Sequence, residues 1–206
     1  MPVSKRILKP LVEEGRVSGY DDPRLPTLEA MRRRGIVPEA IRKFVLSLSF
    51  TKSDTLAPFD TLESFNRKMI DATSVRLFMV TKPVKLVVKN NKVKSVELSN
   101  HPQKDIGKRK VEVDGVFYVS GSDVKDLQIG DQLRLIELYN VKITKIGSDI
   151  EAEYSGDDFK VELPKIQWIT QKSSTKINIL IPKILFVDEK FNENSLETLQ
   201  IGRAHV

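Results

Sequence analysis

Residues 19–27 read GYDDPRLPT, and residues 31–36, a few positions later, read MRRRGI. Thr27 can begin a helix, because its hydroxyl can accept a hydrogen bond from an unpaired amide of the first turn. Gly35 can end one, because glycine adopts the left-handed backbone conformation without a steric penalty. The run therefore predicts a short helix that starts at Thr27 and carries three arginines at its C-terminal end, Arg32, Arg33 and Arg34.

Helical periodicity extends to both sides of this run. Gly15 is expected to end an earlier helix, and Pro38 suits the first position of a later one. Asp60 with Glu63 resembles a capping box at the start of a fourth helix. The apolar side chains expected to face the core are Ile7, Leu8, Leu11 and Val12 in the first helix, Ile41, Phe44, Val45 and Leu48 in the third, and Leu62, Phe65 and Met69 in the fourth.

The pattern changes to short strands near residue 73. Turn signals such as Asn90-Asn91 and Asp114-Gly115 separate segments that alternate apolar and polar residues, as half-buried strands do. Many short strands with tight turns predict one or two antiparallel barrels. The expected strands are Val75–Val80, Val84–Lys89, Val93–Leu98, Lys110–Val113, Val116–Val119, Leu133–Leu138, Val141–Ile146, Ile150–Tyr154, Lys160–Leu163, Ile166–Ile169 and Lys176–Ile181.

The composition narrows the function classes. The 206 residues carry a net charge of +6, which favours a polyanionic partner such as nucleic acid. The chain has no cysteine and only two histidines, so we expect no disulfide, no thiolate zinc site and no other metal site. No apolar run is long enough to span a membrane, and no signal peptide opens the chain. We therefore expect a soluble protein of a reducing compartment.

Several motifs together carry a resemblance to a known family. Val3-Ser4-Lys5-Arg6 resembles the KMSKS loop, the second signature of class I aminoacyl-tRNA synthetases. The GYDDPRLPT and MRRRGI runs, followed by Pro38-Glu39-Ala40-Ile41-Arg42, resemble a segment that archaeal and eukaryotic glutamyl-tRNA synthetases share with glutaminyl-tRNA synthetases. Further matches, at Pro83–Leu86, Asn100–Pro102 and Ile166–Trp168, extend the resemblance over residues 2–186. Residues 51–54 and Tyr139–Val141 resemble the archaeal glutamyl branch more closely.

The resemblance implies an α-helical connecting subdomain followed by two antiparallel β-barrels, the second inserted into the first, with the first barrel incomplete. The implied ranges are residues 1–73 for the KMSKS-like loop and helical subdomain, 74–186 for the anticodon-binding barrels, and 187–206 for a truncated tail. The last six residues match one reading frame of a common sequencing adapter, so we leave them out of the fold prediction.

The implied activity is that of a glutamate–tRNA ligase, which uses ATP and Mg²⁺. The 206 residues show no HIGH-type motif, so we expect this chain alone to be inactive and to bind no cofactor. The expected partner is glutamate tRNA, and glutamine tRNA is left open as a second one. We expect no contact with a membrane. We further expect a monomer that is located in the cytoplasm. The alternatives are a piece of a glutaminyl-tRNA synthetase and a non-enzymatic RNA-binding β-barrel protein.

The resemblance also implies roles for individual residues. Ser4, Lys5 and Arg6 would act on the ATP phosphates, whereas Arg24, Arg32, Arg33, Arg34, Arg76, Lys125 and Arg134 would contact tRNA. Each has a structural alternative. Arg24 could be clamped by Asp21 or Asp22, the three consecutive arginines could stabilise a helix end, and the barrel cations could be solvated strand residues. Trp168 is expected in the core and His101 in a turn.

Overall fold

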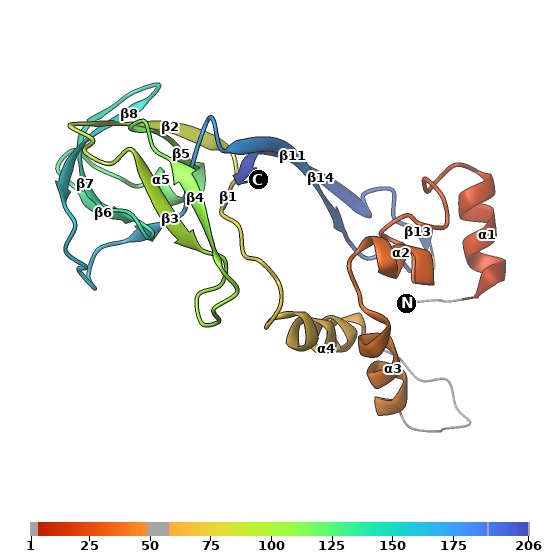
Figure 1. The fold of residues 1–206 in the computed structure, drawn as a ribbon. Coiled ribbons are helices and arrows are strands. Elements are labelled where there is room, and N and C mark those ends of the chain that lie inside the picture. The colour runs from red at the N-terminus through yellow and green to blue at the C-terminus, as the bar shows by residue number, and fades with distance from the viewer. Residues whose placement is uncertain (1–3, 49–57, 189, 206) are drawn as a thin grey trace. The chain divides into compact units, whose positions relative to one another are not determined.

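The computed structural model describes residues 4–48, 58–188 and 190–205, with side chains up to residue 199. The segment of residues 51–54 that favoured the archaeal branch lies outside the described residues. The chain forms two compact units, Met1–Ser74 with Leu180–Leu199 and Val75–Ile179 with Gln200–Val206. The helices and strands of the two units are labelled in Figure 1.

The first unit begins with α1 (Lys5–Glu13), which ends where predicted, with Gly15 at a φ of 69°. Leu8 and Leu11 are buried on one face, whereas Ile7 is 41% exposed, so the prediction that it faces the core was wrong. The second helix, α2 (Leu28–Arg33), begins as predicted, because the Thr27 hydroxyl accepts a hydrogen bond from the amide of Ala30 at 3.1 Å.

Two further helices, α3 (Pro38–Ser47) and α4 (Phe59–Ile70), pack against each other around Ile36, Ala40 and Leu62. Pro38 occupies the first turn, as predicted. Two expectations were wrong. Val45 is 59% exposed, and Asp60 does not cap α4, because the helix begins at Phe59 with Pro58 in the N-cap position.

Asn66 of α4 holds the turn that leads into α3. Its Oδ1 accepts the Val37 amide at 2.9 Å, and its Nδ2 donates to the Gly35 carbonyl at 3.1 Å. Replacing Asn66 with alanine removes both hydrogen bonds, which are partly buried, so at about 0.5–1.5 kcal/mol each we expect a loss of about 1–3 kcal/mol in the free energy of unfolding. Hydrogen exchange of α3 and α4 measures this. The exposed Ser64→Ala on the same helix is the control, and equal protection in both variants would contradict the prediction.

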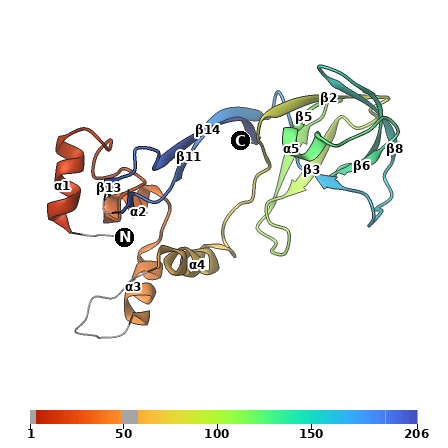
Figure 2. The ribbon, with the colours of Figure 1, turned by 180° about the vertical axis from the view of Figure 1, so that it is seen from behind.

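A C-terminal hairpin completes the first unit. The strands β12 (Phe186–Val187) and β13 (Lys190–Phe191) pair antiparallel, and the rings of Phe186 and Phe191 meet edge to face at 6.3 Å. Together with the buried Leu185, they pack on the core formed by α1, α2 and Leu25, and β13 lies beside α2 in both views (Figure 2). A segment about 150 residues further along the chain therefore stabilises the N-terminal helices.

The second unit is built on a seven-stranded sheet of order β10-β5-β2-β8-β7-β6-β9. Its two edge strands, β9 (Lys165–Ile166) and β10 (Trp168–Thr170), are separated in sequence only by Gln167, so the sheet curls into a nearly closed, barrel-like shape. The intervening strands are β5 (Val116–Ser120), β2 (Pro83–Lys89), β8 (Ile150–Gly156), β7 (Asn140–Ile146) and β6 (Gln132–Leu135).

The core of this sheet contains Trp168, which is fully buried, as predicted. Its indole nitrogen donates to the Ile136 carbonyl at 2.8 Å, and its ring meets Phe117 edge to face at 5.3 Å. A polar tip with a partner lets this large ring occupy the core without an unsatisfied donor. His101 is a turn residue, as predicted, because its Nδ1 accepts the amides of Gln103 and Lys104.

The remaining elements lie outside the seven-stranded sheet. A hairpin forms from β3 (Ser95–Ser99) and β4 (Lys108–Glu112), and the short helix α5 (Gly121–Val124) follows β5 (Figure 1). A three-stranded sheet has the order β1-β14-β11, with β1 (Met79–Val80), β14 (Leu196–His205) and β11 (Ser174–Pro182). The last residues, which we left out of the fold prediction, therefore extend β14, and the backbone of Met79 pairs with that of Ala204.

Two predicted strands differ in the structure. Lys160–Leu163 forms no strand, because β6 already pairs with β7 on one side and β9 on the other. Of Val75–Val80, only β1 is a strand. Residues 180–199 belong to the same compact unit as the helices. The predicted ranges 1–73, 74–186 and 187–206 were drawn by function and not by compactness, so they stay a prediction. The coarse prediction, a small helical part followed by a mostly β region, is confirmed. The expectation of purely antiparallel strands was wrong, because β2 pairs parallel with β8 and β6 pairs parallel with β9.

Candidate nucleic-acid interface

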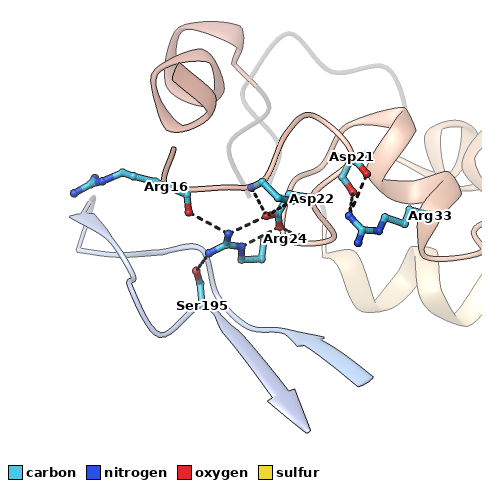
Figure 3. A network of polar contacts seen from close by, with 7 residues as sticks. Arg16, Asp21, Asp22, Arg24, Arg33 and Ser195 are labelled. Atoms are coloured by element: carbon cyan, nitrogen blue, oxygen red, sulfur yellow. Dashed lines mark hydrogen bonds and ion pairs between the residues drawn. The ribbon is translucent and has the colours of Figure 1, made fainter. Parts of the chain in front are cut away.

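The GYDDPRLPT run folds around a buried ion pair (Figure 3). The Arg24 guanidinium donates from Nε to Asp22 Oδ1 at 2.9 Å and from Nη2 to Asp22 Oδ2 at 2.8 Å. Asp22 also accepts the Arg24 amide at 3.0 Å and the amide and hydroxyl of Ser18 at 2.9 and 3.1 Å. The spacing of two residues across Pro23 therefore lets one carboxylate fix both the backbone and the side chain of Arg24.

The electrostatics of Asp22 follow from these bonds. Burial alone would raise the pKa of this carboxyl group, because it disfavours the charged form. The hydrogen bonds from Arg24 and Ser18, together with the charge of the guanidinium, outweigh burial and hold the pKa well below its usual range. Asp22 is therefore ionised at neutral pH and pairs permanently with Arg24.

The same guanidinium connects distant parts of the first unit. Arg24 Nη2 donates to the Arg16 carbonyl at 3.0 Å, and Nη1 lies 3.3 Å from the hydroxyl of the buried Ser195 (Figure 3). Of the alternatives for Arg24, the structure shows the clamp by Asp22. Arg24 is therefore a structural residue of this run, with its guanidinium bound to Asp22, Arg16 and Ser195. Sequence reasoning missed Ser195, since no local signal links positions 171 residues apart.

The three consecutive arginines have different surroundings. Arg34 pairs with Glu63 and lies over the Phe59 ring, 4.5 Å from its centroid, so it joins α2 to α4. Arg33 forms an exposed ion pair with Asp21 at 3.1 Å. Arg32 is exposed and has no ion pair among the described residues. With Asp21, Glu29 and Arg33, it lines an open hollow of about 360 Å³.

The KMSKS-like residues lie at the start of α1. Ser4 precedes the helix, and its carbonyl accepts the amides of Ile7 and Leu8. Lys5 and Arg6 are exposed in the first turn, which contains no acidic residue. Cations are not favoured at this end of a helix, because the helix dipole is positive there. An anion placed here would meet both the two side-chain cations and the free backbone amides.

Arg76 is exposed, but not for the reason predicted. A strand over Val75–Val80 would place Arg76 opposite a core face of Val75, Leu77 and Met79, but Val75 and Leu77 are 53% and 45% exposed, whereas Phe78 and Val80 pack inward. Segment 75–78 is held by its backbone, since the Arg76 amide donates to the Asn100 carbonyl at 2.8 Å and its carbonyl accepts Arg109 Nη1 at 3.2 Å. Sequence reasoning gave Arg109 no role, although it positions the Arg76 backbone.

The two remaining predicted contacts also differ from each other. Lys125 is exposed at the end of α5 and lies 3.7 Å from Asp126, in an ion pair of two exposed side chains. Arg134 on β6 is half-buried, and its Nη1 donates to Asn140 Oδ1 at 2.9 Å and to the Asp157 carbonyl at 3.1 Å. Arg134 therefore holds a loop in place, a role that its position in a strand did not reveal.

The predicted residues are thus distributed over both units, and each unit presents some of them to solvent. Among the residues described with side chains, no three acidic, histidine or cysteine residues form a cluster that could hold a metal ion. No described helix has the length and apolar character that crossing a bilayer requires. The exposed cations Lys5, Arg6, Arg32, Arg76 and Lys125 suit a phosphate-rich partner.

Comparison with known families separates a synthetase from a stand-alone RNA-binding protein. A family model described as "tRNA synthetases class I (E and Q), anti-codon binding domain" matches residues 74–160, and one described as the catalytic domain of the same family matches residues 2–72. The chain belongs to the class I tRNA synthetases for glutamate and glutamine. This confirms the resemblance that the motifs carried, and it disfavours a stand-alone barrel protein, because the helical half matches as well.

Relatives of this class I synthetase chain come from archaea. A glutamate–tRNA ligase of Nitrosopumilus maritimus is 58% identical over 98% of this chain and 35% of its own length. Glutamate–tRNA ligases of Cenarchaeum symbiosum and Pyrococcus furiosus are 48% and 32% identical over 97% and 88% of the chain, and 35% and 32% of their own lengths. The chain thus spans about a third of the curated relatives that it matches.

Proposed function

We propose that this chain is the part of an archaeal-type glutamate–tRNA ligase that closes over ATP and reads the tRNA. The observation that carries the proposal is the similarity to glutamate–tRNA ligases along nearly the whole chain, at 58% identity in one case. The anticodon-binding family match over residues 74–160 supports assigning the proposed reading function to the second unit. The substrates would be glutamate, ATP and glutamate tRNA, and the protein would act in the cytoplasm as a monomer.

The role that we propose for the start of α1 is electrostatic. Lys5 would stabilise the negative charge that develops on the ATP phosphates during adenylate formation, with Arg6 in support and Ser4 shaping the turn. The first turn supports this, because it presents two exposed cations beside free amides and no competing acid. Mg²⁺ would assist in the intact ligase, but the described residues hold no matching set of carboxylates, so we assign it no ligand.

The tRNA contacts that we propose are exposed cations, and each unit supplies its own set. On the helical unit the contacts include Arg32 and Arg33. Arg33 also forms an ion pair with Asp21. Arg34 would support these contacts indirectly, because its ion pair with Glu63 fixes α2 on α4. On the β unit the contacts include Arg76 and Lys125. We further propose that the β region divides into two barrels, one built around β6–β8 and inserted into the other.

The test of this function is tRNA binding by the chain and by its Arg76 variants. If Arg76 contacts a base, Arg76→Ala should weaken binding of glutamate tRNA by about 1–3 kcal/mol and reduce discrimination against an anticodon-swapped tRNA. A pure phosphate contact should instead weaken both tRNAs alike and lower the salt slope by about one unit. Filter binding at several salt concentrations separates these results.

Arg76→Lys is the matched variant, because lysine keeps the charge but loses the planar, two-pronged donor. It should restore a phosphate contact and not a base contact. Wild-type chain that binds neither tRNA would refute the proposed function. Binding that is intact in both variants would refute only the assignment of Arg76.

A further inference from the structure

An aromatic ring stands exposed in the loop between β8 and β9. Phe159 is 64% exposed, and Val161, two residues later, is 76% exposed. Other aromatic rings of the same unit, such as those of Phe117 and Trp168, are fully buried. A single exposed apolar residue is ordinary on a protein surface. The surroundings of Phe159 distinguish it, because its loop is held in place and its ring lies beside two cations.

The loop is fixed by polar side chains of the neighbouring strands. Arg134 Nη1 donates to the carbonyls of Asp157 and Asp158 at 3.1 and 3.5 Å, and Asn140 Nδ2 donates to the Asp158 carbonyl at 2.7 Å. Asn140 is 1% exposed, and Tyr154 donates its hydroxyl to Asp157 Oδ2 at 2.8 Å. The Phe159 ring is therefore presented by a preorganised turn, which lowers the entropy cost of binding a ligand on it.

Two positive charges lie over the ring, which still leaves Phe159 64% exposed. The Lys165 ammonium lies 4.6 Å and the Arg134 guanidinium 5.6 Å from the ring centroid. Neither cation has an ion-pair partner among the residues described with side chains. The nearby carboxylates are those of Asp157, which already accepts a hydrogen bond, and of Asp158 and Glu162. An exposed ring with adjacent cations suits a planar, electron-rich group attached to a phosphate.

We propose that Phe159 is a stacking platform for one unpaired nucleotide of the bound tRNA, with Lys165 facing its phosphate and Arg134 positioning the loop. This rests on the proposed tRNA-binding function and adds a contact to it. RNA is favoured over a protein partner because single strands are bound by stacking on aromatic side chains next to backbone-tracking cations. The net charge of +6 also favours a polyanion.

The first test compares variants of the whole chain in glutamate tRNA binding. Phe159→Ala should weaken binding by about tenfold or more, because stacking on an aromatic ring contributes that much per base. Phe159→Tyr should bind like the wild type, since a ring remains. Val161→Ala, which removes a neighbouring exposed apolar side chain, should have no effect. Lys165→Ala should lower the salt slope by about one unit, whereas Phe159→Ala should leave the slope unchanged.

The second test reads stacking directly. Phe159→Trp adds an exposed indole to a chain whose natural tryptophan, Trp168, is buried, and a base stacked on the new indole should quench its fluorescence when tRNA is added. If the wild type binds tRNA while Phe159→Ala binds equally well and the new indole is not quenched, the platform is refuted and the proposed function stands. A change in oligomeric state of Phe159→Ala without a change in tRNA binding would equally refute it, in favour of a protein contact. Wild-type chain that fails to bind tRNA would refute the function itself.

Discussion

Replacing Asp22 with asparagine is expected to lower the free energy of unfolding of the first unit by about 3–5 kcal/mol, because the change leaves a buried guanidinium without its counter-charge. Arg24 is 8% exposed and Asp22 1% exposed, so water cannot solvate the orphaned charge without local opening. The clamp also joins the Arg16 backbone and Ser195 to this run. The loss of stability should therefore affect the β12–β13 hairpin as well as α1.

The neighbouring residue provides a matched control. Asp21 forms an ion pair with Arg33 at a similar distance, 3.1 Å, but both side chains are about half exposed. Asp21→Asn should therefore cost less than about 1 kcal/mol. The only tryptophan lies in the second unit, so its fluorescence does not report on the first. Hydrogen exchange of α1 and β12–β13 measures the effect, and equal protection in the two variants would contradict the prediction.

The pH dependence follows from the lowered pKa of Asp22. In the folded chain the carboxyl group stays ionised to lower pH than in the unfolded chain, where its pKa is about 3.9. Its contribution is therefore present in full well above that value and is lost as the pH falls below about 4. The protection of the wild-type first unit should decline in this range more steeply than that of Asp22→Asn.

Local signals predicted the helices well, and their failures have identifiable causes. Thr27, Gly35 and Pro38 act within one turn of their own position, so sequence alone placed α2 and α3 to within about a residue. The capping box failed because α4 begins two residues earlier than predicted, with Pro58 as its N-cap residue, so Asp60 lies inside the first turn. The strand through Arg76 failed because Asn100 and Arg109 hold its backbone, which changed the residues that face the core.

The candidate site depended even more on distant contacts. Sequence left Arg24 undecided between RNA and a clamp, because the deciding partners include Ser195, far along the chain. Arg134 could not be separated from an ordinary strand cation, since the carbonyls that it binds belong to a loop more than 20 residues away. The exposure of Phe159 could not be predicted, because the sequence alone does not show whether a phenylalanine in a loop is exposed or buried.

Removing the side chain of Lys5 in a ligase that carries this segment joined to a nucleotide-binding domain is expected to reduce ATP–pyrophosphate exchange by about 10²–10³-fold. A preorganised group that stabilises transition-state charge contributes about 2.7–4 kcal/mol. The loss should appear in kcat, because the charge on the phosphates grows during the reaction and not on binding. Arg6→Ala should also reduce the exchange rate, but by a smaller factor, since Arg6 only supports Lys5. The 206-residue chain alone should show no exchange.

Lys9 provides the control within the same helix. It lies one turn beyond Lys5 and pairs with Glu13 at 3.2 Å on the exposed surface, so Lys9→Ala removes an equal charge without touching the first turn. Exchange should stay close to the wild-type rate in that variant. Lys5→Arg should restore part of the activity, because it keeps the charge but changes its position. A Lys5→Ala ligase with the same kcat as Lys9→Ala would show that the first turn of α1 is a solvated basic surface, and that its likeness to the KMSKS loop carries no catalytic role.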